Sequence, residues 1–240
     1  MKNLYIITLS LFSQCLFSQV NAICVYKTQP IEKKLEITSN DSETDRNSKK
    51  MLLKAYLLAN DLDYILKFNQ NISTSYIDES LLNEGVQNSY LYPIAKALIG
   101  KGVYFQNKNN NSTLRQVSTM GSTFIIKDVL KKNWKIINTR KKIGKYNCIK
   151  AILDCTSCNS TEIVWFTPDI SVPFGPIGYG GLPGLIIEIE KNSSILRLKS
   201  IRFTKTKNKI IKPIKGKEIS IDDYNEMILD IRNRARIMKN

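Results

Sequence analysis

One residue type is missing from this chain, and its absence excludes several kinds of catalytic and metal site. The 240 residues contain no histidine, which excludes Ser-His-Asp and Cys-His catalytic systems and histidine metal sites. A general acid–base pair needs two groups that converge on one pocket. Asp169 is the only acidic residue between Trp165 and Glu188, and Glu188 and Glu190 alternate with isoleucines, as solvent-facing residues of a strand would. The sequence therefore identifies no catalytic residue, and we expect no metal and no cofactor.

The cysteines are the other reactive groups of the chain. Cys15 lies in an apolar leader, and the remaining four are Cys24, Cys148, Cys155 and Cys158. An even number of cysteines in an exported protein predicts disulfides, with three possible pairings. Cys155 and Cys158 also form a C-x-x-C, so a redox-active or metal-binding pair is an alternative. Strand-like runs on both sides argue against a thioredoxin-type site, which lies at a helix N-terminus.

The first 22 residues predict a cleaved signal peptide. A lysine precedes an apolar stretch at Leu4–Phe17, and cleavage can follow Ser18 or Ala22 because small residues are required there. We expect a mature protein without a lipid anchor that forms one domain over residues 23–240. Its expected location is the periplasm or the cell exterior, and association with the outer membrane is left open.

The charge of the chain is strongly basic. Lys and Arg total 36 against 21 Asp and Glu, for a net charge of +15. No nucleic-acid motif accompanies these charges, so we expect a solvated basic surface and no nucleic-acid partner. A helix is predicted near residues 220–238, with Ser220 as its cap and arginines in its last turns. This helix is expected to cover the sheet, and contact with a membrane surface is an alternative.

The segment at residues 160–190 organises the rest of the chain. Strand-like runs flank a loop that is rich in proline and glycine and also carries aromatic and apolar residues. Gly178, Gly180 and Gly184 do not form a dinucleotide fingerprint, because their spacing is one residue too long and a β-branched run follows instead of a helix. We predict a rigid structural loop. Its candidate ligand-binding residues are Trp165, Phe166, Phe174, Tyr179 and Leu182.

A tight turn is predicted at the end of this loop. Proline and glycine at the central positions of Leu182-Pro183-Gly184-Leu185 fit a type II turn, in which the third residue has a positive φ. Gly184 is therefore expected to have a positive φ.

The hexapeptide Gly181-Leu182-Pro183-Gly184-Leu185-Ile186 resembles the signature of the GLPGLI family, secreted proteins of Bacteroidetes-type bacteria. The resemblance extends to Trp165-Phe166-Thr167-Pro168 and, upstream, to residues 134–151. Thr139 and Ser171 depart from the family pattern. The resemblance implies export and a structural role for the hexapeptide, and it implies no established chemistry.

The remaining pattern predicts a mainly β, α+β fold. Strands are expected at residues 23–38, 64–68, 73–77, 124–130, 134–139, 146–153, 185–190 and 195–203, with a loop at 39–50 and a helix at 51–62. In the strand at 195–203 the apolar parity flips near Lys199, which predicts a bulge. Together these elements predict a curved antiparallel sheet or half-barrel with one or two packed helices.

Three functions compete at this point. The first is an exported binding or accessory protein of the cell envelope that holds an apolar or peptide ligand or a partner protein. The second is an enzyme of unrecognised type, and the third is a thiol-redox protein that uses Cys155 and Cys158. The missing acid–base constellation favours the first. The oligomeric state is left open.

Overall fold

The fold is built on one sheet of twelve strands. The computed structural model describes residues 21–80, 82–130, 132–155, 160–206 and 208–237. The strands follow the order β12-β6-β5-β4-β3-β2-β1-β11-β10-β9-β8-β7, and all neighbours are antiparallel except β12 and β6. The strands are β1 (Ala22–Pro30), β2 (Asp63–Phe68), β3 (Ile72–Asp78), β4 (Val103–Asn107), β5 (Ser112–Thr119), β6 (Ser122–Val129), β7 (Lys135–Ile143), β8 (Tyr146–Cys155), β9 (Ser160–Thr167), β10 (Leu185–Glu190), β11 (Ser194–Phe203) and β12 (Lys217–Ser220).

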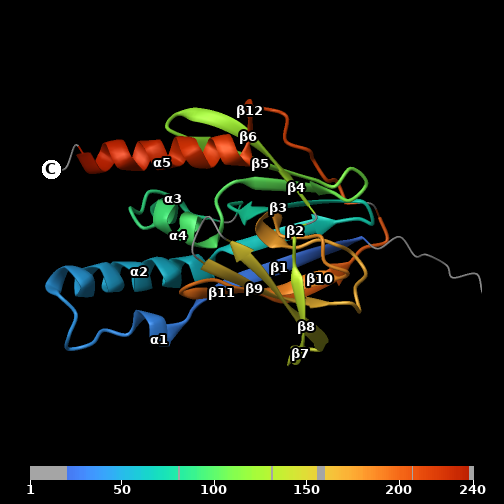
Figure 1. The fold of residues 1–240 in the computed structure, drawn as a ribbon, viewed down its shortest axis with the longest axis horizontal. Coiled ribbons are helices and arrows are strands. Elements are labelled where there is room, and N and C mark those ends of the chain that lie inside the picture. Colours follow the sequence, from blue (N-terminus) through green and yellow to red (C-terminus); the bar gives the residue numbers. More distant parts are fainter. Residues whose placement is uncertain (1–20, 81, 131, 156–159, 207, 238–240) are drawn as a thin grey trace, which may run out of the picture.

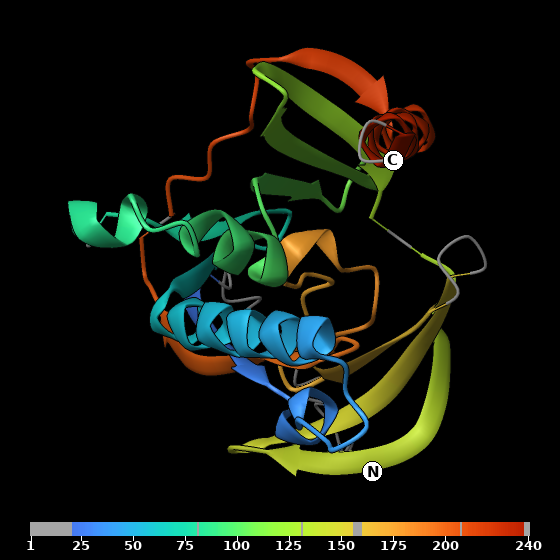
Figure 2. The ribbon, with the colours of Figure 1, turned by 90° about the vertical axis from the view of Figure 1, so that its left-hand side faces the viewer.

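The sheet is strongly curved and does not close. Figure 2 shows the strands around β6 at the top of the molecule and β7 and β8 at the bottom. The helices are α1 (Glu32–Leu35), α2 (Glu43–Asp61), α3 (Glu84–Gln87), α4 (Tyr92–Ile99) and α5 (Ile221–Ile237), with a short 3-10 turn η1 (Pro176–Gly178). The prediction of a mainly β fold with a curved sheet and packed helices is confirmed. None of the helices in the described part of the chain is long and apolar enough to cross a bilayer.

Helix α2 is longer than the sequence pattern predicts. The expected loop at residues 39–50 is wrong from Glu43 onward, because Ser42 starts the helix: its Oγ accepts a hydrogen bond from the backbone N–H of Asp45 at 3.1 Å. Acidic residues in the first turn also stabilise this helix end. Helix α2 packs on β1 and on α4, and α2 and α5 both extend past the left-hand end of the sheet in Figure 1.

The bulge predicted in β11 is confirmed. Val25 of β1 pairs with Ser200, whereas the next residue, Tyr26, pairs with Leu198. Lys199 is therefore the extra residue, and it shifts the side chains before and after it onto opposite parities. This lets Leu196 pack in the core on one side of the bulge and Ile201 contact the same core on the other.

The glycine-rich loop between β9 and β10 lies inside the curve of the sheet, where Figure 2 shows it in orange. Phe174 and Leu182 are buried in the main core. Two tyrosines from neighbouring strands hold the loop: Tyr26 donates its hydroxyl proton to the Ile186 carbonyl at 2.6 Å, and the Tyr64 hydroxyl accepts the N–H of Ile177 at 3.1 Å. The loop therefore fills the interior that the open sheet leaves uncovered.

The prediction of a positive φ at Gly184 is wrong. Gly184 is absent from the positive-φ glycines of the described residues, whereas Gly181 has a φ of 84°. The N–H of Gly184 bonds to the carbonyl of Leu182 at 2.8 Å, so the turn is tighter than type II. Glycine is needed at position 184 because a Cβ would lie 2.1 Å from the backbone oxygen of Thr167. The constraint is close approach of two backbones and not the sign of φ.

The prediction that Glu188 and Glu190 face solvent is wrong for Glu188, whose side chain is fully buried. Its carboxylate pairs with Lys141 Nζ at 2.6 Å and with Arg197 Nε. Glu190 accepts a hydrogen bond from Trp165 Nε1 at 2.6 Å and lies 3.3 Å from Lys141 Nζ. We call these five residues the outer-face cluster, because Trp165 and Glu188 pair across β9 and β10 on the face opposite to the core residues Val164 and Phe166.

The disulfide prediction is wrong for two of its four cysteines. Cys24 and Cys148 are free and completely buried in the main core. They pack as small apolar residues. Cys155 ends β8, and Cys158 lies outside the described residues, so the pairing of the C-x-x-C stays a prediction.

Cys24 and Cys148 are expected to resist thiol reagents in the folded protein. Burial raises the pKa of both thiols, to about 11 for Cys148, and a thiol is far less reactive than a thiolate. Labelling followed by peptide mass spectrometry, with and without denaturant, is the measurement. Fast labelling of either residue in the folded protein at pH 8 would contradict this packing.

Candidate functional site

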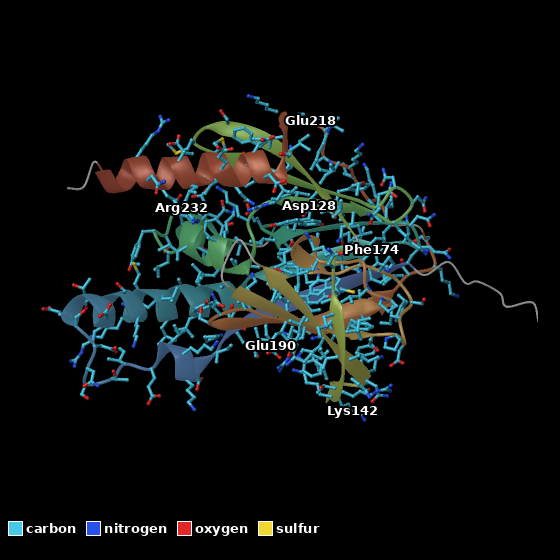
Figure 3. All side chains as sticks on the ribbon, in the orientation of Figure 1. Asp128, Lys142, Phe174, Glu190, Glu218 and Arg232 are labelled. Carbon is cyan, nitrogen blue, oxygen red and sulfur yellow. The ribbon has the colours of Figure 1, made fainter. Side chains whose placement is uncertain are left out.

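A cleft of about 860 Å³ lies where the curved sheet fails to close. Its walls come from both halves of the sheet, from the 3-10 turn and from the start of α5. The lining includes Tyr104, Thr113, Arg115, Ile126, Asp128, Lys132, Asn133, Lys135, Leu153, Glu162, Ile177, Gly178, Tyr179, Asp222 and Asn225. In Figure 3 the labelled Asp128 lies below α5, whereas Glu190 lies in the opposite half of the molecule. The cleft is therefore separate from the outer-face cluster.

Cross-strand pairing brings the first wall together. Tyr104, Arg115 and Ile126 are direct neighbours across β4, β5 and β6. One step along, Gln106, Thr113 and Asp128 form the next row. Because residues two apart share a face of a strand, both rows point toward the inside of the curve.

Two carboxylates continue the core-facing parity of their strands. In β9, Glu162 is on the same parity as Val164 and Phe166, which are buried in the core. In β6, Asp128 is on the same parity as Phe124 and Ile126, which are also buried. Each strand thus runs from the apolar core into the cleft, and an acidic residue replaces the apolar one where the cleft begins.

These carboxylates have different partners. Asp128 pairs with Lys132 at 2.7 Å. Glu162 lies beside the Tyr179 hydroxyl: burial raises the pKa of Tyr179 well above its ordinary value, and repulsion by and hydrogen bonding to Glu162 raise it further. The Tyr179 phenol therefore stays protonated and can act as a hydrogen-bond donor at neutral pH. Asp222 is in the first turn of α5.

The 3-10 turn places Tyr179 in the cleft, and the backbone of this turn is strained. Ile177 has a φ of 50°, which is an outlier for a β-branched residue. Gly178, with a φ of 78°, follows it, and a Cβ there would lie 2.8 Å from the ring of Tyr104. The Gln106 amide holds the Tyr179 carbonyl at 2.8 Å. Strain of this kind persists where the surroundings fix the backbone, and functional sites are one such place.

Only one of the five predicted ligand-binding residues lines this cleft. Phe166, Phe174 and Leu182 are core residues with no more than 2% exposure. Leu182 also lines a second hollow, of about 520 Å³, and the ligand-binding role of these residues stays a prediction. Trp165 belongs to the outer-face cluster, where Lys141 Nζ lies 4.0 Å from its ring centroid. Tyr179 lines the cleft, and its role as a ligand contact stays a prediction.

Lys191 interacts electrostatically with two residues of the cleft lining, Glu162 and Arg115. Lys191 Nζ donates hydrogen bonds to the carbonyls of Leu98 and Ile99, at 3.0 and 2.6 Å, and so caps the C-terminal end of α4. Burial lowers the pKa of Lys191 to about 8, repulsion by Arg115 also lowers it, and attraction by Glu162 partly opposes both.

The pKa of Lys191 predicts a specific pH dependence of stability. Its pKa is lower in the folded state than in the unfolded chain, where it is about 10.4. Between these two values the unfolded state binds more protons, so the lysine's contribution makes the protein more stable as pH rises from about 8 to about 10. Chemical denaturation of the parent and of Lys191→Met at pH 7, 8, 9 and 10 measures this contribution. The parent should gain stability relative to the variant over this range. A constant difference would contradict it.

The cleft can supply general acid–base chemistry or hydrogen-bonded recognition. Three carboxylates, two amides and two tyrosine hydroxyls are the types of group that serve either role. The described residues contain no cluster of three or more Cys, Asp or Glu that could hold a metal ion. Sequence reasoning missed Asp128 and Glu162. The signal that could have revealed them is the acidic residue on the core-facing parity of a strand.

Comparison with known proteins decides the family. The family model described as "N-glycanase peptide, N-terminal domain" matches residues 70–225, well over half of the chain. The chain belongs to this N-glycanase N-terminal domain family. The matched range contains most of the cleft, from Tyr104 on β4 to Asn225 on α5.

Two solved structures have a fold similar to that of this family member. They are entitled "Structure of PNGF-II in C2 space group" and "Structure of PNGF-II in P21 space group". Each is 18% identical in sequence, with a TM-score of 0.54 over 88% of this chain and 33% of the PNGF-II chain. This protein therefore spans about a third of the length of those structures, and at this identity the likeness concerns the fold alone. A search of curated proteins finds no match.

Family membership corrects three of the interpretations drawn from the sequence. The resemblance to the GLPGLI family is wrong as a family assignment, because the family model that matches is the N-glycanase one. The interpretation as an accessory protein of the cell envelope with an apolar or peptide ligand is wrong for the same reason, since the matching family is an N-glycanase one. The thiol-redox alternative with Cys155 and Cys158 is wrong for the same reason, because the family that matches is the N-glycanase one. Membership is compatible with an exported protein.

Proposed function

We propose that this protein has a glycan-related function of the N-glycanase type, in which the cleft at the open side of the sheet receives an asparagine-linked glycan. The observation that carries the proposal is the match to the N-glycanase family over the residues that build the cleft. An N-glycanase, as its name says, acts on N-linked glycans, so the cleft residues of this family member are the first place to look for contact with them.

The chemistry of the cleft suits a sugar. A pyranose ring has apolar C–H faces and a rim of hydroxyl groups. Tyr104 and Tyr179 supply ring surfaces for the apolar faces. Glu162, Asp128 and Asn225 supply hydrogen-bond acceptors and donors for the sugar's hydroxyl groups. An opening of about 860 Å³ accommodates two or three sugar residues.

Titration calorimetry of the purified protein with a defined N-glycopeptide tests the proposal. The peptide without its glycan is the matched ligand control. We expect saturable binding of the glycopeptide only, and about tenfold weaker binding by Glu162→Gln, because hydrogen bonds to a charged group contribute more than neutral ones. Mass spectrometry of the same samples detects any release of the glycan. If neither binding nor release occurs, the proposal is wrong.

The cellular location belongs to the same proposal. Residues 1–22 have the pattern of a signal peptide. An exported protein would encounter glycoproteins of other organisms outside the cytoplasm. N-terminal sequencing of the protein from periplasmic and culture fractions is the check. An uncleaved Met1 in the cytoplasmic fraction would contradict export.

A further inference from the structure

The second hollow, of about 520 Å³, lies next to the cleft. Lys132 lines both spaces, so they are neighbours. The walls of the hollow come from the turn after β4, from the segment that joins β6 to β7, and from the glycine-rich loop. They include Lys108, Trp134, Ile136, Leu182 and Pro183. None of these five residues lines the cleft.

The glycine-rich loop contributes to both spaces because its chain doubles back. Phe174 and Gly180 pair as an antiparallel bridge, and the N–H of Gly181 donates a hydrogen bond to the carbonyl of Pro173 at 2.9 Å. The tip of the loop, with the 3-10 turn and Tyr179, lines the cleft. Its base, with Pro173 and Gly181, lines the hollow. One rigid loop therefore forms part of the wall of each space.

Trp134 connects the hollow to the cleft. Its Nε1 donates a hydrogen bond to the Gly180 carbonyl at 2.8 Å, and its ring centroid lies 6.0 Å from that of Tyr179. The side chain is partly exposed and lines the hollow. These two contacts hold the indole in place, and its exposed surface belongs to the hollow. A fixed, partly exposed ring suits the apolar C–H face of a sugar.

Ile136 and two lysines complete the hollow. Ile136 is 51% exposed and pairs across the strands with the core residue Ala151, so its side chain lies on the core-facing side of the sheet. Lys108 and Lys132 add ammonium groups. Lys132 donates one hydrogen bond to Asp128, and an ammonium group has three donors. Apolar surface with hydrogen-bond donors beside it matches the two kinds of surface of a sugar residue.

We infer that the hollow beside Trp134 is a second sugar subsite, which takes the part of an N-linked glycan that extends beyond the cleft. The inference rests on the proposed function and adds a preference for long glycans over short ones. Trp134 and Ile136 supply the apolar surface, and Lys108 and Lys132 donate hydrogen bonds to sugar hydroxyl groups. One glycan spans both spaces by passing Lys132, the residue that they share.

The test variant is Ile136→Lys, and Leu57→Lys is its matched control. Both replace an exposed apolar side chain, 51% and 60% exposed, by lysine. Leu57 lies on α2 and lines neither space. Both proteins should unfold at the temperature of the parent, because surface substitutions have little effect on stability. Thermal unfolding verifies this before binding is measured.

Three glycopeptides are compared by titration calorimetry with the purified protein. One short peptide carries an N-linked chitobiose, the same peptide carries an oligomannose glycan, and a longer peptide carries the chitobiose. We expect the parent and Leu57→Lys to bind the oligomannose ligand roughly 3- to 10-fold more tightly than the chitobiose ligand, the effect of burying one apolar sugar face. Ile136→Lys should bind these two ligands alike, and the longer peptide should add no affinity.

Tryptophan fluorescence gives an independent measurement at Trp134. The chain has two tryptophans, and the other one, Trp165, is 6% exposed in the outer-face cluster. Quenching by acrylamide therefore reports mainly on Trp134. We expect the oligomannose ligand to reduce quenching in the parent, and the chitobiose ligand to leave it unchanged. Equal quenching with and without saturating oligomannose ligand would contradict a sugar on this ring.

The outcomes separate this inference from the proposed function. If the parent binds the chitobiose and oligomannose ligands equally, or if Ile136→Lys keeps the preference of the parent, the subsite is wrong and the glycan-related function stands. If the longer peptide raises the affinity and the longer glycan does not, the hollow holds peptide and the sugar subsite is wrong. If the parent binds none of the three glycopeptides and releases no glycan, both fail together.

Discussion

Replacing Gly184 by alanine should lower the free energy of unfolding by about 3 kcal/mol or more, an effect at the upper end for an inserted methyl group. The new Cβ would lie 2.1 Å from the Thr167 oxygen and 2.6 Å from its carbonyl carbon. Both are backbone atoms at the end of β9, so no side-chain rotation can relieve the overlap. Gly184→Val should be worse, because two further carbon atoms enter the same space.

The control for this prediction is Gly85→Ala. In the short helix α3, the nearest atom to a Cβ on Gly85 is Asn83 Oδ1 at 3.4 Å. Alanine should therefore be neutral there, or stabilising by about 0.5–1 kcal/mol, because it restricts the unfolded chain. Urea unfolding followed by tryptophan fluorescence measures all three variants. If Gly184→Ala unfolds at the same urea concentration as the parent, the two backbones do not approach as closely as the structure shows.

The second large effect is expected at the outer-face cluster. Replacing both Lys141 and Arg197 by methionine should lower the free energy of unfolding by about 3 kcal/mol, because the buried Glu188 carboxylate then has no cation. Adding Glu188→Leu to that pair should restore most of the loss, since the uncompensated charge is gone. Recovery in the triple variant separates a charge effect from lost packing.

An exposed ion pair supplies the matched control. Lys127 pairs with Glu218, and their side chains are 55% and 62% exposed. Lys127→Met should change the free energy of unfolding by no more than about 0.5 kcal/mol, as exposed pairs contribute little. If the variant with both Lys141 and Arg197 replaced by methionine is as stable as Lys127→Met, solvent reaches Glu188 and the outer-face cluster is only a surface network.

The sequence pattern predicts local features of this fold well, because local sterics and side-chain parity decide them. The bulge at Lys199 is one example: the apolar residues change parity there, and β11 must shift its register to keep Leu196 and Ile201 on the core. The glycine-rich loop is another. Its proline and glycine content predicts an irregular backbone, and the apolar residues Phe174 and Leu182 predict that it packs in the interior.

Features that depend on distant partners are not predictable in this way. Glu188 alternates with isoleucines like a solvent-facing residue, but Lys141 and Arg197 arrive from two other strands and bury it. The cleft is similar, because Asp128 and Glu162 belong to strands at different places in the sheet. The hexapeptide Gly181–Ile186 points to the wrong family because six residues describe only one turn. A match over residues 70–225 identifies the family.

The central position of β1 determines when this protein can fold. β1 lies between β2 and β11, and Ala22 near the start of the chain pairs with Phe203 near its end. Contacts of such long sequence separation form slowly, since a large loop must close before they contribute. During synthesis the middle of the sheet therefore stays open until residue 203 has left the ribosome, with one edge of β1 unpaired. That delay exposes the chain to aggregation, and the export proposed above would use the unfolded form that the delay prolongs.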